Sequence, residues 1–138
     1  MTHVIITDTG FGADDWTGPF TPLADRAANT IAIDVASADD AAVLAPDLAQ
    51  IQMIRVEFPS SADGRGFTLA KQLRQMGYAG RLRAKGHVLA DQYAMARRAG
   101  FDEVEIDEAL AARQPEAQWR DRADWQNHDY QRRLRAAS

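Results

Sequence analysis

Apolar residues recur with two spacings along most of the chain, and together these predict repeated β-α units. Short runs typical of strands occupy residues 3–7, 30–36, 51–58, 81–85 and 102–106. Apolar positions with helical spacing separate them over residues 38–49, 68–76 and 88–99. Strands that alternate with helices through short connections predict a mainly parallel sheet with right-handed crossovers. The predicted fold class is therefore α/β, as an open three-layer sandwich; a half-barrel of β-α units is the alternative.

Local signals predict where the elements begin and end. Ser37 is the expected N-cap of the first helix, because its hydroxyl can accept a backbone hydrogen bond there. Thr68 is expected to begin the second helix, and Gly100 to end the third. Residues 102–106 alternate acidic with apolar side chains, which predicts a half-exposed edge strand.

The two ends of the chain follow the β-α pattern less closely. Residues 9–29 are rich in glycine and proline, so we expect a loop in which Phe11, Trp16 and Phe20 pack, in preference to a mobile lid. Residues 108–138 predict a helical tail broken at Pro115. Its apolar face would carry Trp119, Ala123, Tyr130 and Leu134. With no internal repeat, residues 1–138 are interpreted as a single domain.

Composition narrows the classes of function. The chain has no cysteine, which excludes disulfides, thiolate nucleophiles and thiolate-bound metal centres formed by this chain. Its three histidines lack the spacing of metal ligands, so no metal site is expected. We see no run of 18 apolar residues and no charged-then-apolar leader, so we expect a cytoplasmic protein without a membrane span or signal peptide.

The charge is unevenly divided along the chain. Residues 1–54 carry one basic and eight acidic side chains, residues 55–100 nine and three, and residues 101–138 six and nine. The three net charges of −7, +6 and −3 sum to −4. Because the positive charge is concentrated in the middle, we expect a small anion or an acidic partner. Nucleic acid is not expected at a pI near 5.3 without a recognised binding motif.

The middle segment contains a glycine-rich turn between a predicted strand and a predicted helix. Asp63, Gly64, Arg65 and Gly66 form this turn, and Thr68 follows it. Two glycines permit positive φ angles and a close ligand, and the helix start adds unpaired N–H groups. The turn therefore predicts an anion site, with an ordinary structural turn as the alternative. It lacks the spacing of a dinucleotide or nucleoside triphosphate motif, so no cofactor is identified.

Further polar residues follow in the next β-α unit. Arg81, Arg83 and Lys85 alternate on one strand, and Arg83 is expected to face the same ligand as Arg65; a solvated edge face is the alternative. His87 and Asp91 are candidates for acid or base chemistry. The alternative interpretation makes His87 a surface residue and Asp91 a stabiliser of a helix start.

Several short motifs, taken together, resemble one bacterial family. They are Phe58-Pro59, the stretch from Asp63 to Thr68, Leu73-Arg74, the stretch from Gly80 to Ala84, Gly86, Asp91-Gln92, and the stretch from Arg98 to Asp102. The pattern resembles a domain-of-unknown-function family over about residues 30–107. Its members are described as probable oxidoreductases of sulfite reduction, associated with assimilatory sulfate-reduction genes. The resemblance implies site residues Asp63, Gly64, Arg65, Gly66, Arg74, Arg83, Asp91 and Gln92.

These observations leave two hypotheses of function. The first is an accessory protein of sulfite reduction that binds a small anion or a phosphate-bearing cofactor at the Gly-Arg-Gly turn. The alternative is a non-catalytic module that docks an acidic electron carrier or a sulfite reductase subunit, with a homodimer through the tail as a variant; its contacts would include Trp119, Trp125 and Tyr130. Independent oxidoreductase activity is implied by the resemblance alone.

Overall fold

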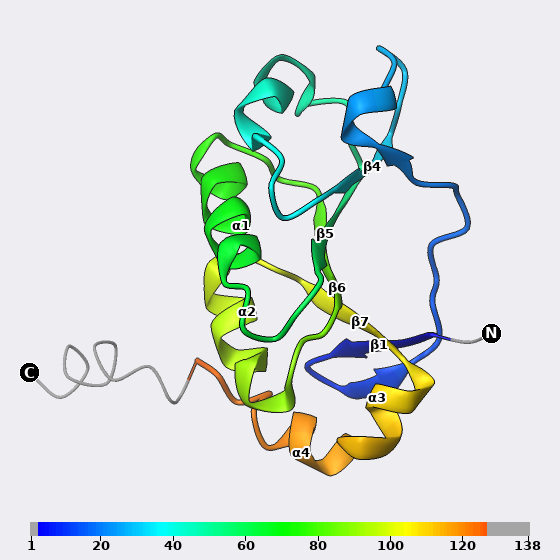
Figure 1. Cartoon of the computed structure of the whole chain (residues 1–138), viewed down its shortest axis with the longest axis vertical. Coiled ribbons are helices and arrows are strands. Elements are labelled where there is room, and N and C mark those ends of the chain that lie inside the picture. Colours follow the sequence, from blue (N-terminus) through cyan, green and yellow to red (C-terminus); the bar gives the residue numbers. More distant parts are fainter. Residues whose placement is uncertain (1–2, 127–138) are drawn as a thin grey trace, which may run out of the picture.

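The computed structural model describes residues 3–126, and an open sheet runs through its centre (Figure 1). The strands are β1 (His3–Thr7), β2 (Gly10–Gly12), β3 (Thr21–Pro22), β4 (Ala32–Val35), β5 (Met53–Phe58), β6 (Arg81–Gly86) and β7 (Glu103–Asp107). Their order is β2-β1-β7-β6-β5-β4-β3. Strands β3 to β7 are parallel, and β1 runs antiparallel to both β7 and β2. The predicted α/β class and its open, mainly parallel sheet are confirmed.

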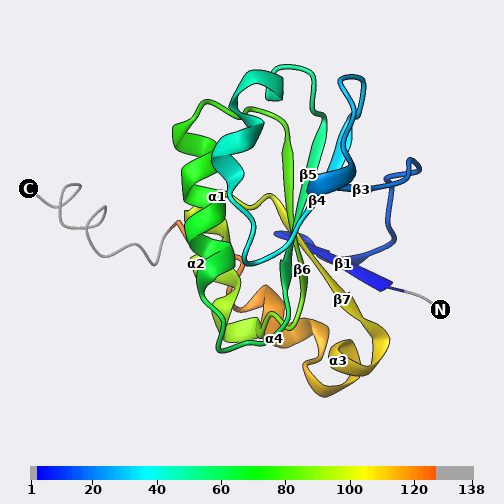
Figure 2. The ribbon, with the colours of Figure 1, turned by 45° about the horizontal axis from the view of Figure 1, so that its top comes forward.

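The helical segments are the 3₁₀ helices η1 (Leu23–Asp25), η2 (Ala41–Asp47) and η3 (Ala90–Gln92), and the α-helices α1 (Arg65–Gln75), α2 (Tyr93–Ala99), α3 (Glu108–Arg113) and α4 (Glu116–Arg120). Helices α1 and α2 and the 3₁₀ helix η2 pack on one face of the sheet, whereas η1 lies beside β4 near its other face. Figure 2 shows α1 and α2 on one side of the sheet, with the chain between β2 and β3 on the other. Parallel strands added consecutively through right-handed crossovers place every crossover on the same face. The expected third layer is therefore an extended segment and not a layer of helices.

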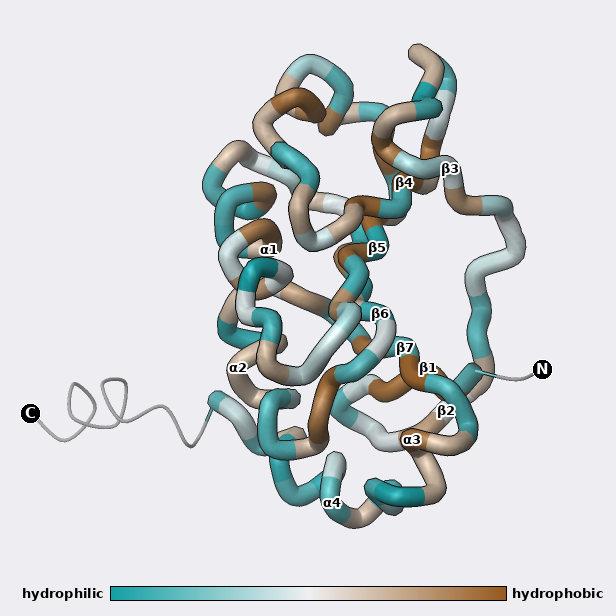
Figure 3. The backbone as a smooth tube through the Cα atoms, in the orientation of Figure 1, coloured by the Kyte–Doolittle hydropathy of each residue, from teal (hydrophilic) through white to brown (hydrophobic). Residues whose placement is uncertain are grey.

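The strands have one apolar and one charged face. Figure 3 shows hydrophobic and hydrophilic stretches alternating along β5 and β6. Toward the helices, the strands present buried apolar residues: Ile33, Val35, Ile54, Val56, Phe58, Leu82, Ala84, Val104 and Ile106. The positions between them include Asp34, Arg55, Arg83, Glu103 and Glu105. A period of two along each strand produces this division.

Several predicted boundaries are confirmed and others are wrong. Strand β1 coincides with the predicted residues 3–7, and Gly100 ends α2 with a φ of 118°. The N-cap at Ser37 is wrong, because the carboxylate of Asp40 accepts the hydrogen bond from the Ala42 N–H. The segment that follows is a 3₁₀ helix containing Pro46, whose missing N–H disfavours a continuous α-helix.

Two further corrections concern helix α1 and strand β7. Helix α1 begins at Arg65, three residues before the expected Thr68. Strand β7 is not an edge strand, because it lies between β6 and β1.

In the predicted helical tail, the break at Pro115 is confirmed, and Trp119 in α4 is buried. Residues Tyr130 and Leu134 of the predicted tail lie outside the described residues.

Candidate functional site

The Gly-Arg-Gly turn lies at the carboxyl edge of the parallel strands. Asp63 accepts hydrogen bonds from the backbone N–H of Arg65 (3.1 Å) and from its Nε (3.0 Å) and Nη2 (2.7 Å). Nη2 also donates to the Ser37 hydroxyl, 3.1 Å away in the loop after β4. Hydrogen bonds from Arg65 hold the pKa of Asp63 well below its usual range. The turn thus presents a fixed guanidinium whose side chain is still 60% exposed.

The two glycines of this turn have different roles, and neither uses a positive φ. Gly64 has a φ of −85° and open space where a Cβ would stand. Gly66 is buried, and a Cβ there would clash with the ring of Phe58. The expectation that both glycines supply positive φ is therefore wrong. Gly66 is required so that α1 can approach the core closely.

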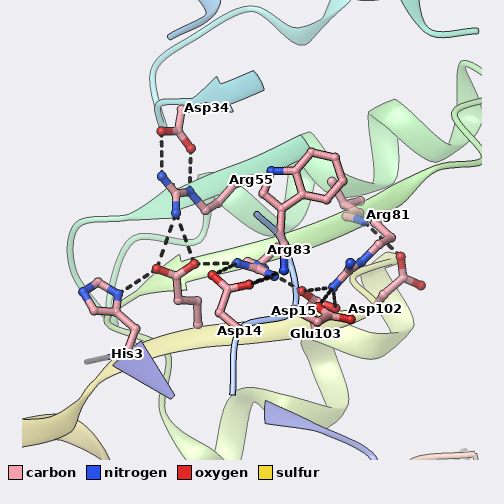
Figure 4. Close-up of polar contacts among 12 residues, drawn as sticks. His3, Asp14, Asp15, Asp34, Arg55, Arg81, Arg83, Asp102 and Glu103 are labelled. Atoms are coloured by element: carbon pink, nitrogen blue, oxygen red, sulfur yellow. Dashed lines mark hydrogen bonds and ion pairs between the residues drawn. The ribbon is translucent and has the colours of Figure 1, made fainter. Parts of the chain in front are cut away.

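Arg83 lies on the other side of the sheet from α1, and the structure does not bring it to Arg65. Its side chain is fully buried. It contacts Glu103 (Nε–Oε2, 2.5 Å), Glu105 (Nη1–Oε1, 2.9 Å) and Asp14 (Nη2–Oδ1, 3.0 Å) (Figure 4). Burial lowers the pKa of Arg83, but these carboxylates outweigh it and the net pKa is raised. The expectation that Arg83 shares a ligand with Arg65 is wrong, because the guanidinium N–H groups of Arg83 are bound to carboxylates of the chain itself.

Arg83 is the centre of a network that we call the charged face. It comprises His3, Asp34, Arg55, Arg81, Arg83, Glu103 and Glu105 (Figure 4). Residues 13–20, here called the strap, cross this face and supply Asp14 to Arg83 and Asp15 to Arg81. The ring of Phe20 lies 3.8 Å from the Arg55 guanidinium. The predicted packed loop is thus held by ion pairs as well as by aromatic contacts.

Two other predicted site residues join backbone segments. Arg74 donates to the carbonyls of Tyr78 (3.0 Å), Gly80 (2.9 Å) and Gly100 (2.8 Å). These carbonyls precede β6 and β7, so Arg74 lies at the amino edge of the sheet, opposite the turn. Gln92 donates to the Ser61 carbonyl at 2.8 Å, which links η3 to the loop that leads into the turn.

The remaining candidates show no catalytic pairing. The exposed His87 donates its backbone N–H to the Phe58 carbonyl at 2.9 Å. Asp91 is 80% exposed and pairs with Arg122 at 2.6 Å instead of orienting His87. Thr68 lies on the exposed side of α1. Among residues 3–126, no group of three or more acidic or histidine side chains is placed to hold a metal ion.

Sequence reasoning missed a cavity at the carboxyl edge of the sheet, on the charged face. It has a volume of about 370 Å³ and is lined by Pro22, Leu23, Ala24, Asp34, Val35, Ala36, Asp39, Arg55, Glu57 and Lys85. Four of its polar residues, Asp34, Arg55, Glu57 and Lys85, come from β4, β5 and β6, and the fifth, Asp39, lies in the segment after β4. The alternation of polar residues along these strands was visible in the sequence, but the pairing of strands that brings Glu57 opposite Lys85 was not.

Comparison with known proteins identifies a family. Residues 32–138 match the model of a family described as "Bacterial protein of unknown function (DUF934)", and the chain belongs to that family. No curated protein and no solved structure matches the chain. In residues 3–126, no helix is long and apolar enough to span a membrane.

Proposed function

We propose that this member of a bacterial family of unknown function is an accessory protein of assimilatory sulfite reduction. It would bind a small oxyanion, or the phosphate of a cofactor, at the Gly-Arg-Gly turn. The link to sulfite reduction rests on the resemblance of the motifs around that turn. The choice of site rests on the exposed guanidinium of Arg65.

Arg65 carries this proposal because its charge is both fixed and accessible. Asp63 and Ser37 engage Nε and Nη2, and the Arg65 Nη1 donates no hydrogen bond within residues 3–126. Arg65 is also the first residue of the eleven-residue helix α1, where the helix dipole favours an anion. An oxyanion bound there would accept from Nη1 while Asp63 keeps the guanidinium oriented.

The docking alternative has less support from the geometry. An acidic partner needs accessible cations, but Arg81 and Arg83 of the basic middle segment are both paired with carboxylates of the same chain. Trp119, one of its proposed contacts, is only 1% exposed. Trp125 lies against Arg97, with 5.0 Å from the guanidinium to the ring centre. An acidic partner would therefore meet few unpaired cations on the described surface.

A growth experiment tests the role in sulfur assimilation. We expect deletion of the gene to slow growth on sulfate as sole sulfur source, and growth on cysteine to remain normal. Wild-type protein and Lys71→Ala, an exposed residue of α1, should restore growth, whereas Arg65→Ala should not. Normal growth of the deletion strain on sulfate would refute the proposed role.

A further inference from the structure

We propose that the cavity of about 370 Å³ on the charged face binds a free α-amino acid with an apolar side chain. This site is separate from the Gly-Arg-Gly turn, and the inference does not rest on the proposed function. It rests on a positive and a negative side chain that face each other across two neighbouring strands near the carboxyl edge of the sheet. Neither forms a hydrogen bond or an ion pair among residues 3–126.

The two charges are Glu57 and Lys85. They are directly opposed in the β5–β6 register, and both line the cavity. Their opposite charges attract each other across these two parallel strands. Within residues 3–126, however, neither side chain takes part in a hydrogen bond or ion pair. An ammonium and a carboxylate are therefore both available at one cavity.

The acidic neighbour on the other side of Lys85 is already engaged. Glu105 lies opposite Lys85 in the β6–β7 register. Its carboxylate contacts His3 at 2.7 Å, Arg83 at 2.9 Å and Arg55 at 3.2 Å. Because three basic side chains surround Glu105, Lys85 is left as the donor for a ligand.

The charges around the cavity favour a zwitterion over a simple anion. Asp34 and Arg55 neutralise each other through contacts of 2.6 and 2.9 Å. Of the remaining lining residues, Lys85 is positive, and Glu57 and Asp39 are negative. A lone anion near Lys85 would be repelled by these carboxylates. An amino acid places its carboxylate on Lys85 and its ammonium on Glu57, so that both charges of the protein are matched.

The rest of the cavity wall suits an apolar side chain. Pro22, Leu23, Ala24, Val35 and Ala36 form that wall. The cavity volume of about 370 Å³ lies near the lower end of the range for small-molecule sites. The structure therefore assigns the ammonium group of the ligand to Glu57 on β5 and its carboxylate to Lys85 on β6. The side chain of the ligand would lie against the segment from Pro22 to Ala24.

Titration of the ¹⁵N-labelled full chain tests this site. L-Leucine is the probe, with 4-methylpentanoate and 3-methylbutylamine as analogues that lack the ammonium and the carboxylate. We expect saturable shifts of the Val35 and Ala36 amides with L-leucine up to about 20 mM, in the range of weak ligand affinities. Each analogue should bind at least about tenfold more weakly, because one protein charge is then unmatched.

Three variants complete the test. Lys85→Met and Glu57→Gln should each weaken binding of L-leucine at least about tenfold, while Lys71→Met, an exposed cation on α1, should leave it unchanged. Native amide spectra of the variants would show that the fold is retained. The proposal is overturned if L-leucine causes no shifts at the cavity, if either analogue binds as tightly as L-leucine, or if binding survives in both cavity variants.

Discussion

Arg83 carries a full positive charge at a position with no exposed surface. Two of its carboxylate partners, Glu103 and Glu105, are also buried, at 5% and 3% exposure. Charges removed from water are tolerated only when they are paired and hydrogen-bonded. At the scale of single residues, Arg83 is therefore a determinant of stability and not a ligand-binding residue.

Replacing Arg83 with methionine tests this assignment. Because the change leaves two buried glutamates without their shared cation, we expect a loss of about 3–5 kcal/mol in the free energy of unfolding. Urea denaturation measures it, with Lys71→Met as a surface control that should change little. A loss below about 1 kcal/mol would contradict a central role for Arg83 in the charged face.

The two glycines beside Arg65 make a matched pair. Gly66→Ala would force a methyl group against the buried Phe58 ring, so we expect destabilisation of about 1–3 kcal/mol. Gly64→Ala meets no atom within 4 Å and keeps an ordinary φ, so we expect no loss, or a gain of up to about 1 kcal/mol. Thermal or urea unfolding distinguishes them, and equal effects of the two substitutions would refute the close-packing account of Gly66.

At the scale of elements, the strap depends on ionised carboxylates. Burial raises the pKa of Asp14, but hydrogen bonds from Arg83 outweigh it and the net pKa is lowered. The pKa of Glu105 is lowered in the same way, since Arg55 and Arg83 outweigh its burial. A carboxyl group whose pKa is lower in the folded than in the unfolded state stabilises the fold above its unfolded pKa. That stability is lost as the pH falls toward the folded pKa.

The strap therefore predicts a particular acid dependence of stability. The free energy of unfolding should be constant above about pH 5 and should fall as the pH drops below the ordinary values of 3.8 for Asp and 4.5 for Glu. Asp14→Asn should be less stable than wild type at neutral pH and should lose less on acidification. Urea unfolding at a series of pH values measures both. Parallel pH profiles for the two proteins would show that Asp14 does not hold the strap.

Elements with local signals were predictable from the sequence, and those defined by distant partners were not. The pattern of residues 3–7 identified β1, and Gly100 marked the end of α2. The alternating glutamates of β7 indicated a half-exposed edge strand, yet Glu103 and Glu105 are buried. Their partners include Arg83 on the neighbouring strand, and Asp14 covers the same arginine from 69 residues upstream of it. No local pattern reports such a contact.

At the scale of the whole molecule, the uneven charge along the sequence is largely explained by folding. Six of the nine basic residues in residues 55–100 form ion pairs among the described residues: Arg55, Arg65, Arg74, Arg81, Arg83 and Arg97. All but Arg65 pair with carboxylates from the acidic segments on either side. The basic middle segment is thus mainly complementary to the rest of the chain. Arg65 is an exception, because its ion-pair partner Asp63 belongs to the same basic segment and its side chain is 60% exposed. For this reason Arg65 carries the proposed function.

Thermal unfolding with oxyanions tests that claim most directly. Wild type, Arg65→Ala and the control Lys71→Ala would be heated with sulfite, sulfate, phosphate or flavin mononucleotide. At about a hundred times its dissociation constant, a ligand of the turn should add about 2.7 kcal/mol and raise the unfolding temperature by several degrees. We expect that shift in wild type and Lys71→Ala, and its loss in Arg65→Ala. No shift with any of these compounds, or an equal shift in Arg65→Ala, would contradict an anion site at the Gly-Arg-Gly turn.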